Sequence, residues 1–103
     1  MSDRVSVVRL QWDEAYRGLS SGPRGASDPH VLEQIEAVTN ALRRRIGGTF
    51  TLGELVAVYD SSDRWALDAI AERSTGSEWL RTASTATDAA FHLYARGARD
   101  YAP

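Results

Sequence analysis

The chain has 103 residues, a net charge of −2 and no cysteine. This length corresponds to one domain, and 43% hydrophobic with 25% charged residues is typical of a folded globular protein. The lack of cysteine excludes disulfides, thiolate metal sites and cysteine catalysis. The small negative charge gives no overall attraction for polyanions such as nucleic acid.

The start of the chain and its apolar runs bear on location. Residues 1–10 lack a long apolar core, so we expect no signal peptide. No run approaches the roughly 18 apolar residues of a membrane span, and we therefore expect a cytoplasmic protein. All basic residues are arginine, which indicates a GC-rich coding bias because most solvated surfaces accept arginine and lysine equally.

The first segment, residues 5–20, shows helical spacing of apolar residues, most securely from Leu10 onward. The positions with this spacing are Val5, Val8, Trp12, Ala15, Tyr16 and Leu19. Partial alternation near the start leaves an extended conformation open for Arg4–Val8. Residues 20–27 are rich in serine and glycine and predict a flexible linker.

The second segment has the strongest helical pattern in the chain. Ser27 or Asp28 is the predicted cap, and Pro29 falls in the first turn, where its missing N–H does no harm. Gly47 and Gly48 predict the end of this helix. One apolar stripe runs along it, made of Val31, Ile35, Val38, Leu42 and Ile46, with Leu32 and Ala41 beside it.

A third helix begins at a capping box. Thr51 is a good N-cap, and Glu54 stands three residues later, where its carboxylate can reach the N–H of the cap. Phe50 and Leu55 flank these residues at the spacing of a hydrophobic staple. Gly53 either weakens this helix or lets another backbone come close. The helix is expected to run to about residue 60, with Leu52, Leu55, Val56 and Tyr59 on its inner face.

A fourth helix is predicted over residues 64–73. Ser61, Ser62 and Asp63 are expected to break the third helix and cap the fourth. The predicted inner face consists of Trp65, Ala66, Ala69 and Ile70. Two short helices joined in this way resemble a helix-turn-helix hairpin.

The fifth helix is predicted to start at Ser84 or Thr85, because Thr85 and Asp88 have the spacing of a second capping box. Trp79 and Leu80 are then expected to pin the preceding connection onto the core. The helix has a small-residue face and a broad apolar arc, formed by Ala86, Ala90, Leu93 and Gly97 and by Phe91, Tyr94 and Ala95. It ends at Gly97, and the tail, residues 98–103, is expected to dock only through Tyr101.

These segments predict a compact all-α domain of four or five helices that covers residues 1–103. Catalytic and metal sites find no support in the sequence. Ser84, Asp88 and His92 share a helix face, but residues eight apart are about 12 Å apart along the axis, which excludes a Ser-His-Asp triad. Asp88 and His92 instead fit a simple pair one turn apart. The other histidine of the chain, His30, is far away in the sequence, so we expect no enzyme, no metal and no cofactor.

Large aromatic residues are numerous for such a small core, and most of them must lie in it, so the question is whether two or three remain partly exposed. Exposed rings would form an anchor patch for another protein or for a second copy of this chain. The candidates are Trp12, Tyr16, Phe91, Tyr94 and Tyr101. The sequence therefore favours a non-enzymatic protein-interaction or regulatory module, with a homodimer as one form.

The alternative is a nucleic-acid-binding transcriptional regulator of the helix-turn-helix type. Its contacts would come from Arg43, Arg44, Arg45 and Arg64. Three cations in the last turn of a helix also complement the helix dipole, which is the simpler interpretation. The fourth helix carries Asp63, Asp68 and Glu72, which would repel phosphate. Nucleic acid is thus the less favoured partner.

Two stretches resemble a family of small uncharacterised actinobacterial helical proteins. The first is Thr49-Phe50-Thr51-Leu52-Gly53-Glu54-Leu55, followed by Tyr59 and Trp65-Ala66. The second is Ala89-Ala90-Phe91-His92-Leu93-Tyr94-Ala95-Arg96-Gly97-Ala98-Arg99-Asp100-Tyr101. The resemblance covers about half of the chain and implies a helical fold, without an activity or site residues.

Overall fold

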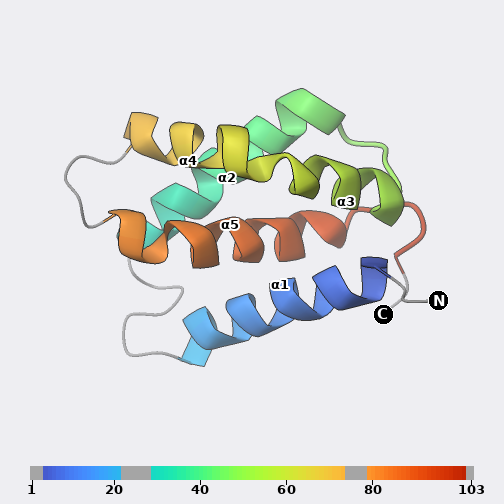
Figure 1. Cartoon of the computed structure of the whole chain (residues 1–103), viewed down its shortest axis with the longest axis horizontal. Helices are drawn as coiled ribbons and strands as arrows, with labels where there is room; N and C mark the ends of the chain where they lie inside the picture. The colour runs from blue at the N-terminus through green and yellow to red at the C-terminus, as the bar shows by residue number, and fades with distance from the viewer. Residues whose placement is uncertain (1–3, 22–28, 74–78, 102–103) are drawn as a thin grey trace.

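The computed structural model describes residues 4–21, 29–73 and 79–101, which form five α-helices with no strand among them (Figure 1). The helices are α1 (Arg4–Ser21), α2 (Pro29–Ile46), α3 (Leu52–Asp60), α4 (Ser62–Arg73) and α5 (Trp79–Ala95). They pack into a body of 40 × 28 × 22 Å. The predicted all-α class is confirmed.

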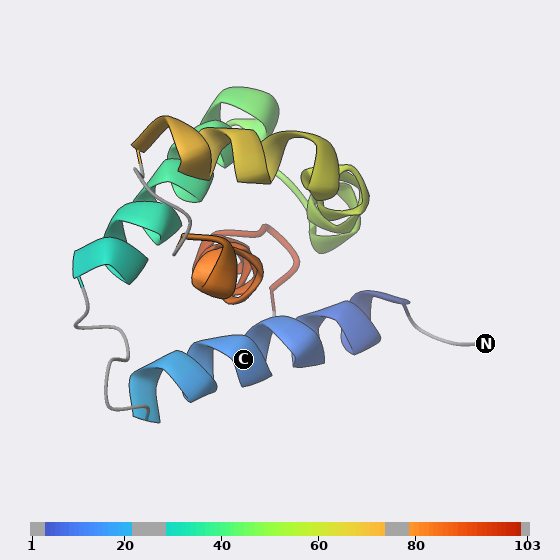
Figure 2. The ribbon, with the colours of Figure 1, turned by 60° about the vertical axis from the view of Figure 1, so that its left-hand side comes forward.

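Helix α5 lies in the middle of the fold, although it comes last in sequence among the described helices. It contacts each of the other four helices, and Figure 2 shows it nearly end-on between α1 on one side and α2 and α4 on the other. Helix α1 contacts α5 and α3 and no other described helix. It therefore forms a separate layer, held on by one face.

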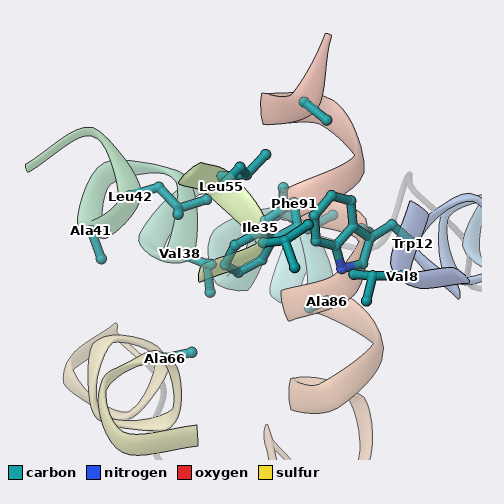
Figure 3. Close-up of a cluster of buried hydrophobic side chains, with 14 of the residues drawn as sticks. Val8, Trp12, Ile35, Val38, Ala41, Leu42, Leu55, Ala66, Ala86 and Phe91 are labelled. Atoms are coloured by element: carbon teal, nitrogen blue, oxygen red, sulfur yellow. The ribbon is translucent and has the colours of Figure 1, made fainter. Parts of the chain in front are cut away.

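The core is built from small residues on α5 and larger ones on the surrounding helices. Among the buried residues of α5 are Ala83, Ala86, Ala89 and Ala90, and Phe91 is the large side chain among them. Figure 3 shows Phe91 and Ala86 facing Val8 and Trp12 of α1 and the apolar stripe of α2. The predicted small-residue face holds at Ala86 and Ala90, whereas Gly97 is exposed.

Helix α1 is helical from Arg4 onward, so the extended alternative for Arg4–Val8 is wrong. Val8 is buried against the core and Val5 is half-buried, which places both on the inner side of a helix. The helix continues to Ser21, two residues into the predicted linker. Linker residues 22–27, with the predicted caps Ser27 and Asp28, lie outside the described residues.

Helix α2 buries most of its predicted apolar stripe. It ends at Ile46, directly before the glycines that predicted its end. Val31, Ile35, Val38 and Leu42 are buried, while Leu32 beside them is 47% exposed. Gly47 has a φ of 76°, and its N–H donates to the Arg43 carbonyl over 3.0 Å. A positive φ of this kind favours glycine because a Cβ would crowd the backbone.

Opposite effects are expected from adding a methyl group at two glycines. Gly47→Ala should lower the free energy of unfolding by about 1 kcal/mol, since alanine is strained at positive φ. Gly53→Ala should raise it by about 0.5–1 kcal/mol, since Gly53 is helical and a Cβ there would meet only Thr51 Oγ1 at 3.9 Å. Urea titration of both variants checks this. A lower free energy of unfolding in Gly53→Ala would contradict this expectation, because the structure shows no backbone close to the position of the added Cβ.

The capping box at the start of α3 is confirmed. The Glu54 N–H donates to Thr51 Oγ1 over 3.2 Å, and the Thr51 N–H donates to Glu54 Oε1 over 3.0 Å. Phe50 and Leu55 are both buried in the core cluster, as the staple requires. The two bonds between Thr51 and Glu54 thus fix where α3 begins.

The turn between α3 and α4 is shorter than predicted. Ser61 alone separates the helices, and α4 starts at Ser62 instead of Arg64. The Ser61 hydroxyl donates to the Val58 carbonyl over 2.9 Å and accepts a bond from Trp65 Nε1 over 3.3 Å. Ser61 alone therefore ends α3 and connects it to α4, where residues 61–63 were predicted to do so. Figure 2 shows α4 from the side and α3 almost end-on, so the chain changes direction here. A helix-turn-helix role for this hairpin stays a prediction.

The predicted start of α5 is wrong by about one and a half turns. The helix begins at Trp79, so the capping box at Thr85 and Asp88 and the connection at Trp79 and Leu80 are wrong. Ala83 and Ala86 are both buried, which shows that the inner face extends before Ser84. Packing of these alanines against the neighbouring helices outweighs the local cap signal.

The tail docks through more than Tyr101, contrary to the prediction. Ala98 is buried, and the Arg99 N–H donates to the Phe50 carbonyl over 2.8 Å. Asp100 Oδ1 accepts the N–H of Leu52 over 2.7 Å. Because that N–H belongs to the first turn of α3, the tail supplies a second cap to this helix.

Candidate functional site

Two of the five predicted surface aromatics are core residues. Trp12 is 1% exposed and Phe91 is 0% exposed, so neither can bind a partner in the folded chain, and the prediction is wrong for both. Their ring centroids lie 5.2 Å apart, and Tyr59 stands edge-on to each, at 5.3 Å from Trp12 and 4.9 Å from Phe91. These rings fill the space that the alanines of α5 leave.

The other three predicted aromatics are partly buried and each contacts its own chain. The Tyr16 ring stacks on His92 at 4.6 Å, and Tyr94 stacks on Phe50 at 4.8 Å. The Tyr94 hydroxyl also donates to the Gly47 carbonyl. Tyr101 lies under the guanidinium of Arg9, 4.8 Å from its ring centroid. Each ring thus has an internal structural role, and they do not account for a binding surface by themselves.

A partly buried polar pair joins α3 to α5. The Tyr59 hydroxyl donates to Asp88 Oδ1 over 2.7 Å. Burial raises the pKa of Asp88 above its ordinary value. Burial, followed by the hydrogen bond and the negative charge of Asp88, raises the pKa of Tyr59 well above its ordinary range. The proton therefore stays on the phenol, which acts as a fixed donor.

A second polar contact joins α1 to α5. His92 Nδ1 lies 2.5 Å from Asp13 Oδ1, and His92 Nε2 lies 3.3 Å from a guanidinium nitrogen of Arg96. These neighbours fit a proton on Nδ1, donated to Asp13, and a lone pair on Nε2 that accepts from Arg96. The predicted pairing of Asp88 with His92 is wrong, because each side chain bonds to a residue of another helix instead.

These polar contacts are suited to fastening helices together. Both ring nitrogens of His92 are engaged, and Ser84 is an exposed residue two turns before it on α5. Among the described residues no three histidine, aspartate or glutamate side chains are placed to hold a metal ion. The Asp13–His92 pair is part of the seat of α1 on α5.

We expect the ionised carboxylate of Asp88 to lower the free energy of unfolding at pH values above the acidic range. Its pKa is raised in the folded state, so the folded chain binds more protons and stability falls as pH rises from the ordinary carboxyl pKa through the raised one. Asp88→Asn keeps an acceptor for Tyr59 and should flatten this fall, with unfolding free energy at pH 7 equal to or above that of the wild type. Thermal unfolding from pH 3 to 8 measures it.

Asp88→Ala is the matched comparison, because it leaves the Tyr59 hydroxyl without its acceptor. We expect a loss of about 1–3 kcal/mol. Equal pH profiles for the wild type and Asp88→Asn would contradict the assignment of the titration to Asp88.

The arginines of the nucleic-acid alternative are all exposed. Arg43, Arg44 and Arg45 occupy the last turn of α2, where they complement the helix dipole. The Arg45 guanidinium stacks on Trp65 of α4, 4.6 Å from the ring centroid. Arg64 lies in the first turn of α4 next to Asp63. Of these four arginines, Arg45 therefore already contacts an aromatic ring of its own chain.

Sequence reasoning missed an exposed apolar pair on α1. Val7 is 57% exposed and Leu10 is 55% exposed, the two highest values among the large exposed hydrophobic residues of the described chain. Arg4 and Glu14 are also exposed and continue the same side of the helix at spacings of three or four residues. We call Arg4, Val7, Leu10 and Glu14 the outer face of α1. The burial of Val8 and Trp12, which turns Val7 and Leu10 outward, is the signal that locates it.

Comparisons with family models, with curated proteins and with solved structures gave no match to this chain. Within the described residues, no helix has both the length and the apolar character needed to cross a membrane. The arrangement of the side chains is therefore the basis for a functional proposal.

Proposed function

We propose that the protein is a non-enzymatic interaction or regulatory module of the cytoplasm, which binds another protein chain through the outer face of α1. The observation that carries this proposal is the exposure of Val7 and Leu10, one turn apart on a single helix. Apolar side chains at this spacing anchor helices into a partner surface.

The position of α1 in the fold supports the same proposal. Its inner side is fixed by Val8 and Trp12 in the core and by the Asp13–His92 pair. A helix that is seated in this way presents its other side with little change of structure on binding. Pre-ordering of the contact side chains reduces the entropy lost on association.

Affinity capture from the native cell tests the proposal. The bait is the wild-type chain, and the comparison bait carries Val7→Glu and Leu10→Glu. Leu32→Glu is the matched control, because Leu32 is 47% exposed on α2 instead of α1. We expect specific capture by the wild type and by Leu32→Glu and its loss in the double variant. Equal capture by all three baits, each with a native circular dichroism spectrum, would contradict the proposal.

The nucleic-acid alternative predicts a different measurement. Binding through Arg43, Arg44, Arg45 and Arg64 should give retention on heparin that falls steeply with salt. Replacing Arg43 and Arg44 by glutamine should then abolish the retention. No retention at low salt would remove this alternative and leave the interaction proposal unaffected.

A further inference from the structure

We infer that the partner of the outer face of α1 is a second copy of the chain, bound so that the two α1 helices run antiparallel about a two-fold axis. The inference rests on the proposed function and names its partner. It depends on the order of side chains along the outer face, which is Arg4, Val7, Leu10, Glu14. A cation stands at one end, two apolar residues in the middle and an anion at the other end.

This order is complementary to its own reverse. When two such helices meet antiparallel, Val7 of each chain faces Leu10 of the other at the centre. Glu14 of each chain then reaches Arg4 of the other at the two edges. The apolar side chains lose contact with water while Arg4 and Glu14 of each chain meet their opposite charges, as in symmetric interfaces between identical subunits.

A parallel arrangement lacks this match. It would place Arg4 against Arg4 and Glu14 against Glu14, and like charges in contact oppose association. The helix dipoles would also be aligned in the same direction, whereas the antiparallel arrangement opposes them. The charges therefore select one orientation and favour a second copy over a partner of unrelated sequence.

Arg4 can take part although it already contacts Asp60. The two side chains are 59% and 49% exposed, so the pair lies at the surface and contributes little to stability. A guanidinium has five N–H donors in a planar fork and can bond two carboxylates at once. Asp60 then helps to hold Arg4 at the rim, where Glu14 of the second copy would arrive.

The first test is the mass of the chain in solution. Sedimentation velocity over a concentration series should show a species of twice the 11.3 kDa of one chain. Leu10→Glu should remove this species, because it places two carboxylates at the apolar centre, and Leu32→Glu should retain it. A wild-type chain that stays at the mass of one chain throughout would overturn the second-copy inference. Loss of a captured partner in the double variant would still support the proposed function.

A charge exchange tests the pairing of Arg4 with Glu14. Arg4→Glu alone and Glu14→Arg alone should each weaken self-association by about tenfold, because each homodimer gains two contacts between like charges. An equimolar mixture of the two variants should recover the dimer, since every rim contact in the mixed pair joins opposite charges. Failure of the mixture to recover, with both variants helical, would overturn the proposed register.

Cross-linking tests the orientation. The natural chain has no cysteine, so single cysteines report without background. Val7→Cys mixed with Leu10→Cys should form a disulfide-linked heterodimer faster than either variant links to itself. Faster linking of each variant to itself would indicate a parallel pair and overturn the inference. A dimer whose mass is unchanged by Leu10→Glu would place the contact elsewhere and overturn it too.

Discussion

Phe91→Ala is expected to lower the free energy of unfolding by about 3–5 kcal/mol. The Phe91 side chain is 0% exposed and contacts rings from three helices: Trp12 of α1, Tyr59 of α3 and Trp65 of α4. Its removal leaves a cavity at the point where these helices meet α5. The total stability of a domain of this size is about 5–15 kcal/mol, so this one change should remove a large part of it.

Urea titration followed by circular dichroism measures the loss in Phe91→Ala. Phe91→Leu is the control, because it keeps an apolar side chain of similar size and should lose less than about 1.5 kcal/mol. Similar losses in the two variants would show that the contacts between aromatic rings, and not the filled volume, are what matters at this position.

Trp12→Ala should cost about 3–5 kcal/mol as well, with its effect concentrated in α1. Trp12 is the largest fully buried side chain of the described chain, and α1 contacts only α3 and α5 among the described helices. Its indole ring packs against Tyr59 and Phe91, so most of its contribution comes from its apolar surface. Without it, the smaller apolar side chains such as Val8 and the Asp13–His92 pair should not keep α1 in place.

Hydrogen exchange separates this expectation from a general loss of stability. Amides of α1 should exchange faster in Trp12→Ala than those of α2 and α4, because the region opens on its own. Gln11→Ala is the control, since Gln11 is the exposed neighbour on the same helix and its loss should fall within about 0.5 kcal/mol. Uniform acceleration across all five helices would contradict a separate opening of α1.

Helix boundaries were predictable where a local signal decides them. Thr51 and Glu54 fix the start of α3 through bonds within four residues, and Gly47 ends α2 through a φ that glycine adopts readily. The start of α5 was not predictable in this way. Thr85 and Asp88 have the spacing of a cap, but burial of Ala83 carries the helix further back, and burial depends on the other helices.

The candidate site shows the same division between local and tertiary information. Trp12 and Phe91 were candidates for an exposed patch because the sequence has many rings, but these two rings fill the space around the alanines of α5. Asp88 and His92 are one turn apart, yet each bonds to a different helix. Val7 and Leu10 became recognisable as a surface once the inner side of α1 was known.

The central place of α5 has a consequence for synthesis in the cell. Until the ribosome has translated that helix, α1 lacks its main neighbour, whereas α2, α3 and α4 can already contact one another. The carboxylate of Asp100, which follows α5 in the sequence, then completes the cap of α3. The apolar inner side of α1 should therefore stay exposed until α5 has emerged, and a chain at that stage should be a substrate for chaperones that shield exposed apolar segments.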